Sequence, residues 1–207
     1  MSINLDKTIF ANIAWMKYYQ GKTSDDYITN KTGGGSFVRD EEEALEETLY
    51  SEIDGKVYGS AFLGRYTDSS GKEQWRKFNL KGHFKDTDGK ILENTTVLWV
   101  AQEIINKTEP CIIGWWENAN LLREFGKVRF SKNGYRYNKS YNIVADSDNA
   151  YLIKPDKRNF KVGRKRRDGV GFGQSNVWYA KSEKGKEFKK EAINYVKKVK
   201  SSKEALV

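Results

Sequence analysis

Cationic and flat aromatic side chains are the residues of this sequence best suited to chemistry on a partner molecule. Eight Lys or Arg and one Asp lie between Lys154 and Arg167, and eight Lys with three Glu lie between Lys181 and Lys200. The chain also holds 6 Trp, 12 Tyr and 10 Phe. Ammonium and guanidinium groups neutralise phosphates, and aromatic rings stack on bases. The two kinds of side chain together predict a surface that binds nucleic acid.

The distribution of charge supports a polyanionic partner more strongly than the total does. The net charge is +9 and the isoelectric point is about 9.4, but many basic proteins bind nothing in particular. The stretch from Asp40 to Asp54 is acidic, which contrasts with the two basic stretches. Within it, the consecutive carboxylates from Asp40 to Glu47 could hold a metal, but we interpret them as a solvated face that could keep DNA away from that side. Such asymmetry is typical of a protein with one nucleic-acid face.

The loop VGRKRRDGVGFGQSN, residues 162–176, is the most informative basic segment. Its four glycines allow tight turns, and Arg164 to Arg167 are consecutive cations. The loop is predicted to enter a groove or wrap phosphates, and the alternative is a solvated surface loop. It lacks the strand and helix context of a nucleotide-binding GxGxxG motif. The predicted phosphate-binding residues are Arg158, Lys161, Arg164, Lys165, Arg166 and Arg167.

The scarcity of Cys and His excludes several kinds of site. Cys111 cannot form an internal disulfide, and we interpret it as a core residue in the apolar run CIIGWW. His83 alone cannot complete a zinc site or an HNH nuclease centre. Glu187 and Lys189 have nuclease-like spacing but lie on a predicted helix. We expect no catalytic residue, no metal and no cofactor, although a Lys- or carboxylate-based site stays open.

The pattern of apolar residues predicts a mainly β protein of the α+β class. Thr8 to Met16 is predicted to be a strand, and Asp54-Gly55 a hairpin turn between ALEETLYSEI and KVYGSAFLG. Val97 to Asn118 is predicted to be a core hairpin that carries Trp99, Trp115 and Trp116. Phe188, Ala192, Tyr195, Val196 and Val199 form the apolar stripe of a C-terminal helix. Many short strands and one packed helix favour a partly closed β-barrel with flanking helices.

The chain length favours a single domain over residues 1–200, with 201–207 as a tail or the start of a linker. No apolar run reaches 18 residues, and the first residues lack the layout of a signal peptide. A cytoplasmic location without a membrane partner is therefore expected.

Four segments, NIAWMKYYQG with the following GGGSFV, VLWVA with IIGWWEN, SYNIVADSDNAYLI, and GFGQSNVWYA, resemble a known family. They are similar to the N-terminal specificity region of modification-dependent (type IV) restriction endonucleases, either McrB-like or HNH-fused. The resemblance implies a PUA-superfamily, YTH-like barrel that reads a modified base in double-stranded DNA. It also implies a fused or associated nuclease or NTPase subunit. Asn176-Val177-Trp178 resembles the Asn-x-Trp element of a YTH cage.

Reading a modified base by extrusion needs stacking rings, polar groups for the base edge and nearby cations. Extrusion costs a few kcal/mol, and stacking recovers about 1–3 kcal/mol per base. Strand alternation sends the rings of Trp115 and Trp116 to opposite faces, so at least one of them is predicted to be core. Trp99 is interpreted as core, and Trp75 has no special role. The predicted pocket residues are Trp15, Trp115, Trp116, Trp178, Asn12, Asn118, Ser175 and Asn176.

Three functions remain open from the sequence. The first is a non-enzymatic DNA reader of a restriction system. The second is an RNA-binding PUA-like module. The third is a small nuclease or base-modifying enzyme with an unrecognised active site.

Overall fold

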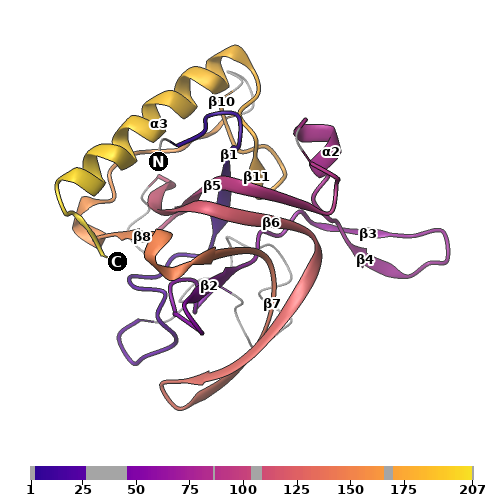
Figure 1. Ribbon diagram of the computed structural model, residues 1–207, viewed down its shortest axis with the longest axis horizontal. Coiled ribbons are helices and arrows are strands. Elements are labelled where there is room, and N and C mark those ends of the chain that lie inside the picture. Colours follow the sequence, from indigo (N-terminus) through magenta and orange to yellow (C-terminus); the bar gives the residue numbers. More distant parts are fainter. Residues whose placement is uncertain (1–2, 27–45, 86, 104–108, 166–169, 207) are drawn as a thin grey trace.

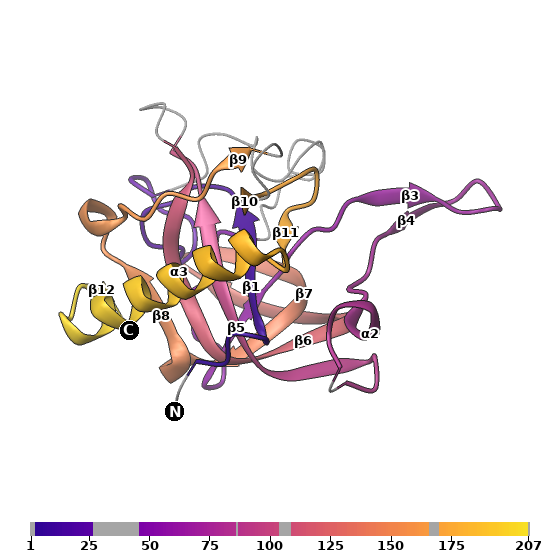
Figure 2. The ribbon, with the colours of Figure 1, turned by 90° about the horizontal axis from the view of Figure 1, so that it is seen from above.

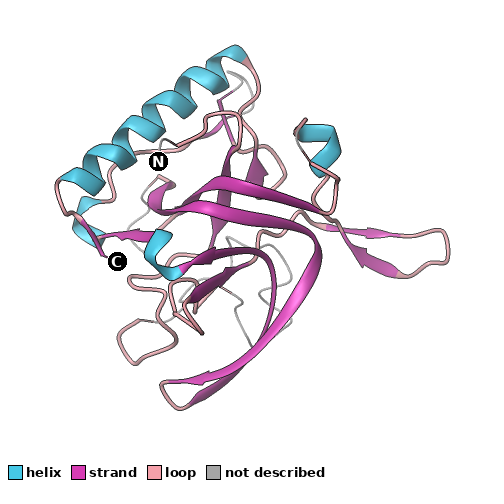
Figure 3. Cartoon of the chain, in the orientation of Figure 1, coloured by secondary structure: helices cyan, strands magenta, loops and turns pink. Residues whose placement is uncertain are grey.

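The computed structural model describes residues 3–26, 46–85, 87–103, 109–165 and 170–206. These residues form a mainly β protein with two α-helices (Figures 1 and 3). The elements in chain order are β1 (Thr8–Ile13), β2 (Lys56–Gly59), β3 (Arg65–Thr67), β4 (Glu73–Trp75), α2 (Leu80–His83), β5 (Ile91–Ala101), β6 (Cys111–Lys132), β7 (Tyr135–Asp146), η1 (Ser147–Asn149), β8 (Ala150–Ile153), η2 (Pro155–Lys157), β9 (Arg164–Lys165), β10 (Val170–Gly171), β11 (Val177–Trp178), α3 (Glu183–Ser201) and β12 (Ala205–Leu206).

One mixed, open sheet of eight strands organises the chain. Its main order is β11-β1-β5-β6-β7-β2, with β8 beside β6 and β12 beside β8. The pair β1–β5 is parallel, and the other pairs of this sheet are antiparallel. The strands at the two ends, β11 and β2, span only 2 and 4 residues and do not pair with each other. The structure therefore forms no closed barrel in its described part, because these short edges offer few backbone groups for closure.

The hairpin turn at Asp54-Gly55 is confirmed by an antiparallel bridge between Ile53 and Lys56, but the predicted strand before it is wrong. Both residues have positive φ angles of 52° and 73°, as a tight hairpin turn requires. The following strand β2 nevertheless pairs along its length with β7. The preceding segment 46–50 forms turns instead of a strand. Its backbone hydrogen bonds go to the loop after β1, since Tyr50 N–H donates to the carbonyl of Tyr19 at 3.0 Å.

Glu46 is the first residue of the acidic stretch that the structure describes, and its burial differs from the expected solvent exposure. Its side chain is only 4% exposed, and its carboxylate accepts a hydrogen bond from the Ala14 amide at 2.8 Å. Burial raises the pKa of this carboxyl to about 7. Glu46 is therefore a buried structural group and not part of a solvated face. The other residues of the run up to 45 lie outside the described residues.

The sheet separates two apolar cores, and the predicted core hairpin β5–β6 contributes to both. In β5, Val97 and Trp99 face one core, whereas Leu98 faces the other. In β6, Trp116 joins Trp99 in the first core, with ring centroids 5.0 Å apart. Trp115 lies in the second core, 4.9 Å from the ring of Tyr151. The alternation predicted for the two tryptophans is thus confirmed.

Helix α3 covers the second core along one face of the sheet (Figure 2). It begins after Ser182, whose hydroxyl accepts a hydrogen bond from the Gly185 amide at 3.1 Å. This N-terminal cap satisfies one of the free amide donors of the first turn. The predicted apolar stripe packs on the core and is confirmed. Beyond the helix, Ala205–Leu206 of the stretch interpreted as a tail form β12, which pairs with β8.

The hairpin β3–β4 extends away from the body of the protein (Figure 2). It is a separate two-stranded sheet in which Tyr66 pairs with Gln74. The Asp68 carboxylate organises its turn by accepting from the amides of Ser70 and Lys72, each at 3.0 Å. Gly71 completes the turn with a φ of 82°.

Candidate nucleic-acid interface

The structure does not bring the predicted tryptophans together in one pocket. Trp115 and Trp116 have no exposed surface and fill two different cores. This burial corrects the prediction that they line a base pocket. Their rings stabilise the sheet on its two faces and are closed off from any ligand.

Arg158 is a structural residue and not a phosphate contact. Its side chain is only 9% exposed and lies 4.8 Å above the ring of Trp15. Its guanidinium donates to the carbonyl of Ile153 at 2.9 Å, to that of Met16 at 2.7 Å and to that of Lys17. The rigid fork of an arginine suits this bridge between distant segments. Trp15 is half-buried against the first core and is occupied by this contact.

The segment after the glycine-rich loop brings two of the predicted polar residues together. The strand β11 pairs with β1, and Asn12 Nδ2 donates to Asn176 Oδ1 at 3.3 Å. Asn12 is 3% exposed, so it anchors this edge of the sheet. Trp178 packs on Phe10 at 4.8 Å, under α3, and belongs to the second core.

The remaining predicted residues are scattered. Asn118 is exposed at a positive φ of 51°, where β6 is irregular. Lys161 is exposed and forms an ion pair with Glu109 at 2.7 Å. The backbones of Arg164 and Lys165 form β9, whereas Arg166 and Arg167 lie outside the described residues. The phosphate role of the cations from Lys161 to Arg167 stays a prediction.

A groove of about 890 Å³, here called the aromatic groove, lies between the hairpin β3–β4, helix α2 and the segment 174–179. Of the predicted residues, it includes only Ser175. Its walls combine aromatic, cationic and amide side chains. They are Leu63, Tyr66, Trp75, Arg76, Lys77, Phe78, Asn79, His83, Arg123, Gln174, Ser175, Val177 and Tyr179.

Two of its rings come from the projecting hairpin. Tyr66 is 46% exposed, among the largest exposures of any bulky hydrophobic side chain in the described chain. Trp75 is half-buried, with its ring against Phe62 at 5.1 Å and the Arg65 guanidinium at 4.2 Å. One ring of the hairpin is thus held in place, and the other is presented to solvent.

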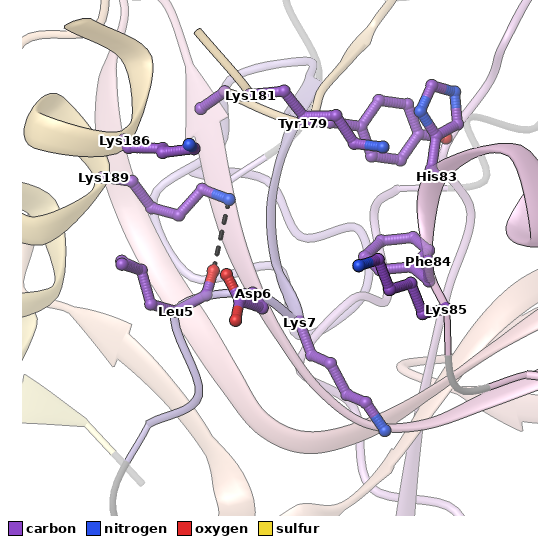
Figure 4. Close-up of a pocket in the computed structure, with 11 residues that line it drawn as sticks. Leu5, Asp6, Lys7, His83, Phe84, Lys85, Tyr179, Lys181, Lys186 and Lys189 are labelled. Atoms are coloured by element: carbon purple, nitrogen blue, oxygen red, sulfur yellow. Dashed lines mark hydrogen bonds between the residues drawn. The ribbon is translucent and has the colours of Figure 1, made fainter. Parts of the chain in front are cut away.

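The opposite wall of the groove is a stacked pair. The rings of His83 and Tyr179 lie 3.7 Å apart with an interplanar angle of 16° (Figure 4). Burial lowers the pKa of His83, and the nearby charge of Lys181 lowers it further. The imidazole is therefore neutral at pH 7. Its Nδ1 is buried. The neutral imidazole stacked on the phenol ring forms a flat wall, and the Nδ1 atom of this imidazole lacks a hydrogen-bond partner among the described residues.

The charge of the groove is positive. Arg76, Lys77 and Arg123 line it, and no carboxylate is among the lining residues. Lys77 forms an ion pair with Glu124 at 2.6 Å, and Arg76 lies 5.8 Å from the ring of Tyr66. Both residues of the Lys77 pair are about half exposed or more, so the pair is weak and solvent-screened. The groove therefore favours an anionic ligand with flat faces.

The groove residues other than Ser175 were missed by the sequence interpretation for physical reasons. The alternation in β11 turns Trp178 to the α3 side, whereas its neighbours Val177 and Tyr179 line the groove. The predicted segment thus borders the groove, but through Tyr179 and not through Trp178. A turn signal, DSSG at residues 68–71, was present between Tyr66 and Trp75 and could have placed those two rings on one hairpin.

Comparison with known proteins identifies no relative of this chain. No family model, no curated protein and no solved structure matches this chain. Within the described ranges, no group of three or more His, Cys, Asp or Glu side chains is placed to hold a metal ion. None of the described helices is both long and apolar enough to cross a membrane.

Proposed function

We propose that this protein binds nucleic acid in the aromatic groove, as the specificity domain of a modification-dependent restriction system that reads a modified base in DNA. The observation that carries the proposal is the composition of the groove. Exposed Tyr66, the anchored Trp75 and the His83–Tyr179 wall surround one cavity with three cations and no carboxylate. The motif resemblance supports the finer part, namely the modified base, the PUA-like relation and the nuclease or NTPase partner.

The groove has the parts that binding of an extruded base requires. Stacking on aromatic rings is worth about 1–3 kcal/mol per base, which offsets the few kcal/mol of unstacking and unpairing. Arg76 and Arg123 supply charges for the flanking phosphates. The amide of Gln174 and the hydroxyl of Ser175 supply donors and acceptors for a base edge. Because a methylated base is neutral, stacking and methyl burial would select it.

Tyr66→Ala tests the proposal with little risk to the fold, because this ring is 46% exposed. We expect the dissociation constant for a modified duplex to rise about tenfold. The matched control is Tyr135→Ala, whose ring is 47% exposed outside the groove and whose loss should leave binding unchanged. Fluorescence anisotropy with a labelled duplex measures both. Equal affinities of wild type and Tyr66→Ala would overturn the groove assignment.

The cations are tested by the salt dependence of binding. Arg76→Ala and Arg123→Ala should each make the slope of log Kobs against log salt shallower by about 0.9 on duplex DNA. Arg136→Ala, an exposed arginine that does not line the groove, is the control of equal charge. An equal change of slope for all three variants would point to diffuse attraction by the net charge instead of contacts in the groove.

A comparison of ligands separates the candidate functions. Matched duplexes that are unmodified or carry 5-methylcytosine or N6-methyladenine should differ in affinity if the proposal holds. Tighter binding of the matching single-stranded RNA would favour the second candidate, because RNA readers also stack splayed bases on aromatic rings. Cleavage or base conversion of labelled DNA by this chain with a divalent metal would contradict a reader without catalysis.

A further inference from the structure

A second cavity, here called the lysine pocket, lies on the far side of the His83–Tyr179 wall. It has a volume of about 470 Å³ and is formed by α3, the segment before β1, the residues around the end of α2 and the segment 179–181. None of its lining residues is in the predicted phosphate set. They are Leu5, Asp6, Lys7, His83, Phe84, Lys85, Tyr179, Ala180, Lys181, Lys186 and Lys189.

The charge of the lysine pocket is strongly positive. Five lysines and one carboxylate, that of Asp6, line it. Lys186 is paired with the exposed Glu183 at 2.7 Å. Lys181 and Lys189 form no ion pair with any carboxylate that the structure describes. The positive charges of the pocket thus exceed the negative charge that its own residues supply.

Lys189 is the most constrained of these lysines. It is 5% exposed, and its ammonium reaches from α3 into the pocket beside that of Lys186, opposite the wall of His83 and Tyr179 (Figure 4). The only hydrogen bond described for this ammonium runs to the carbonyl of Leu5 at 3.2 Å. An ammonium has three donors. A buried cation with one such bond has two donors left for a ligand.

The surroundings of Lys189 disfavour its charge in the empty pocket. Burial lowers the pKa of this lysine to about 8. The nearby carboxylate of Asp6 acts in the opposite direction, and the charges of Lys181 and Lys186 lower the pKa further. A bound anion would relieve both the repulsion and the missing hydrogen bonds.

We propose that the lysine pocket binds a phosphate group of the nucleic-acid strand whose base enters the aromatic groove. Phosphate fits because its oxygens accept several charged hydrogen bonds from different directions. The volume also leaves room for the sugar that carries it. His83 and Tyr179 line both cavities, so base and phosphate can belong to adjoining parts of one strand. The identity of this ligand rests on the proposed function, whereas phosphate binding itself can be measured without it.

The test follows the lysine ¹³Cε signals of the full chain by NMR during titration with three probes. The probes are inorganic phosphate, a 5′-phosphorylated single-stranded oligonucleotide and the same oligonucleotide with a 5′-hydroxyl. The signals of Lys181 and Lys189 should shift, and the pKa of Lys189 should rise towards the ordinary lysine value. Tighter binding of the 5′-phosphorylated strand identifies a terminal monoester as the source, and equal binding identifies an internal diester.

Lys181→Ala is the main variant, because this lysine is exposed and its loss leaves the core intact. It should weaken phosphate binding about tenfold, the usual effect of one charged hydrogen bond. Lys197→Ala removes the same charge from an exposed position of α3 outside the pocket and should change affinity less than about twofold. Lys189→Met, checked by circular dichroism for folding, should abolish the response at Lys181.

The proposal is overturned if no probe shifts the Lys181 and Lys189 signals, or if Lys197→Ala weakens binding as much as Lys181→Ala. A comparison with Tyr66→Ala distinguishes failure of the phosphate proposal from failure of the proposed nucleic-acid function. If the pocket responds to inorganic phosphate but wild-type protein binds no oligonucleotide, the nucleic-acid function and the strand source both fail. If Tyr66→Ala weakens the oligonucleotide while Lys181→Ala does not, the groove assignment stands and the pocket assignment fails.

Discussion

At the scale of single residues, Arg158 shows how a cation in a basic stretch can be a structural element. Its guanidinium joins the chain after β1 to the chain after β8 through three backbone carbonyls. Nothing in the sequence distinguishes it from Lys157 or Lys161, because two of its three partners, the carbonyls of Met16 and Lys17, lie far away along the chain. Burial of a side chain depends on tertiary packing, which a run of charges does not encode.

Arg158→Met should therefore lower stability and leave nucleic-acid binding at the groove unchanged. The variant leaves three carbonyls without their donor, so the free energy of unfolding should fall by about 3 kcal/mol or more. Urea denaturation measures this change, with Lys161→Met as the exposed control expected within about 0.5 kcal/mol of wild type. Unchanged stability together with weaker DNA binding would restore the phosphate role.

Gly59 offers a second residue-scale prediction in the first core. A Cβ at this position would lie 2.9 Å from the rings of Trp99 and Trp116, neither of which can move in the packed interior. Gly59→Ala should destabilise the fold by about 1–3 kcal/mol. Gly173→Ala, where a Cβ meets no atom within 4 Å, is the control. Equal midpoints of urea unfolding for the two variants would contradict this packing.

At the scale of elements, long periodic segments could be predicted and short ones could not. The stripe of α3 extends over many residues, so its periodicity indicated both a helix and its buried face. The apolar runs of β5 and β6 indicated buried strands, but not which core each side chain enters. By contrast β11 has two residues, and its pairing with β1 decides that Tyr179 and not Trp178 reaches the groove. The parallel pair β1–β5 likewise joins segments far apart in sequence. Most of the core was therefore predictable, and most of the candidate site was not.

The helix α3 gives a prediction on pH. The pKa of Lys189 in the folded protein is about 8, below the ordinary lysine value of 10.5, so the unfolded chain binds more protons between these values. The free energy of unfolding should then rise between about pH 8 and pH 10.5, because Lys189 loses its proton more easily in the folded protein. The stability that Lys189 contributes is fully present above pH 10.5 and is lost as the pH falls through about 8. Lys189→Met should remove that rise. Urea denaturation across the window, with Lys197→Met as control, measures it, and identical profiles would contradict the burial of this ammonium.

The hairpin β3–β4 is an element that the rest of the sheet does not need. It pairs only with itself, and its described ring contact with the body is that of Trp75 on Phe62. Replacing residues 66–74 by a short Gly-Ser linker should lower Tm by only a few degrees and abolish nucleic-acid binding. Calorimetry and anisotropy measure the two effects. Loss of folding would show that the hairpin is part of the core, and retained binding would place the ligand elsewhere.

At the scale of the whole molecule, the two cores are physically inseparable. Successive side chains of β1 and β5 alternate between them, and the chain cannot leave one core without leaving the other. Unfolding should be one transition. Fluorine signals from fluorotryptophan at Trp115 and Trp99 should therefore report the same urea midpoint. Separate midpoints would mean that α3 and its core form an independent unit.

The His83–Tyr179 stack has a consequence for how the two proposed ligand groups act together. Each ring borders both cavities, so an occupant that presses on the wall from one side changes the surface offered on the other. Thermodynamic reciprocity then requires that a base changes the affinity for phosphate by the same factor as phosphate changes the affinity for the base. A base that binds more tightly in the groove would thus also change the affinity of the lysine pocket for phosphate. Base-specific binding and sequence-independent phosphate binding would then be cooperative.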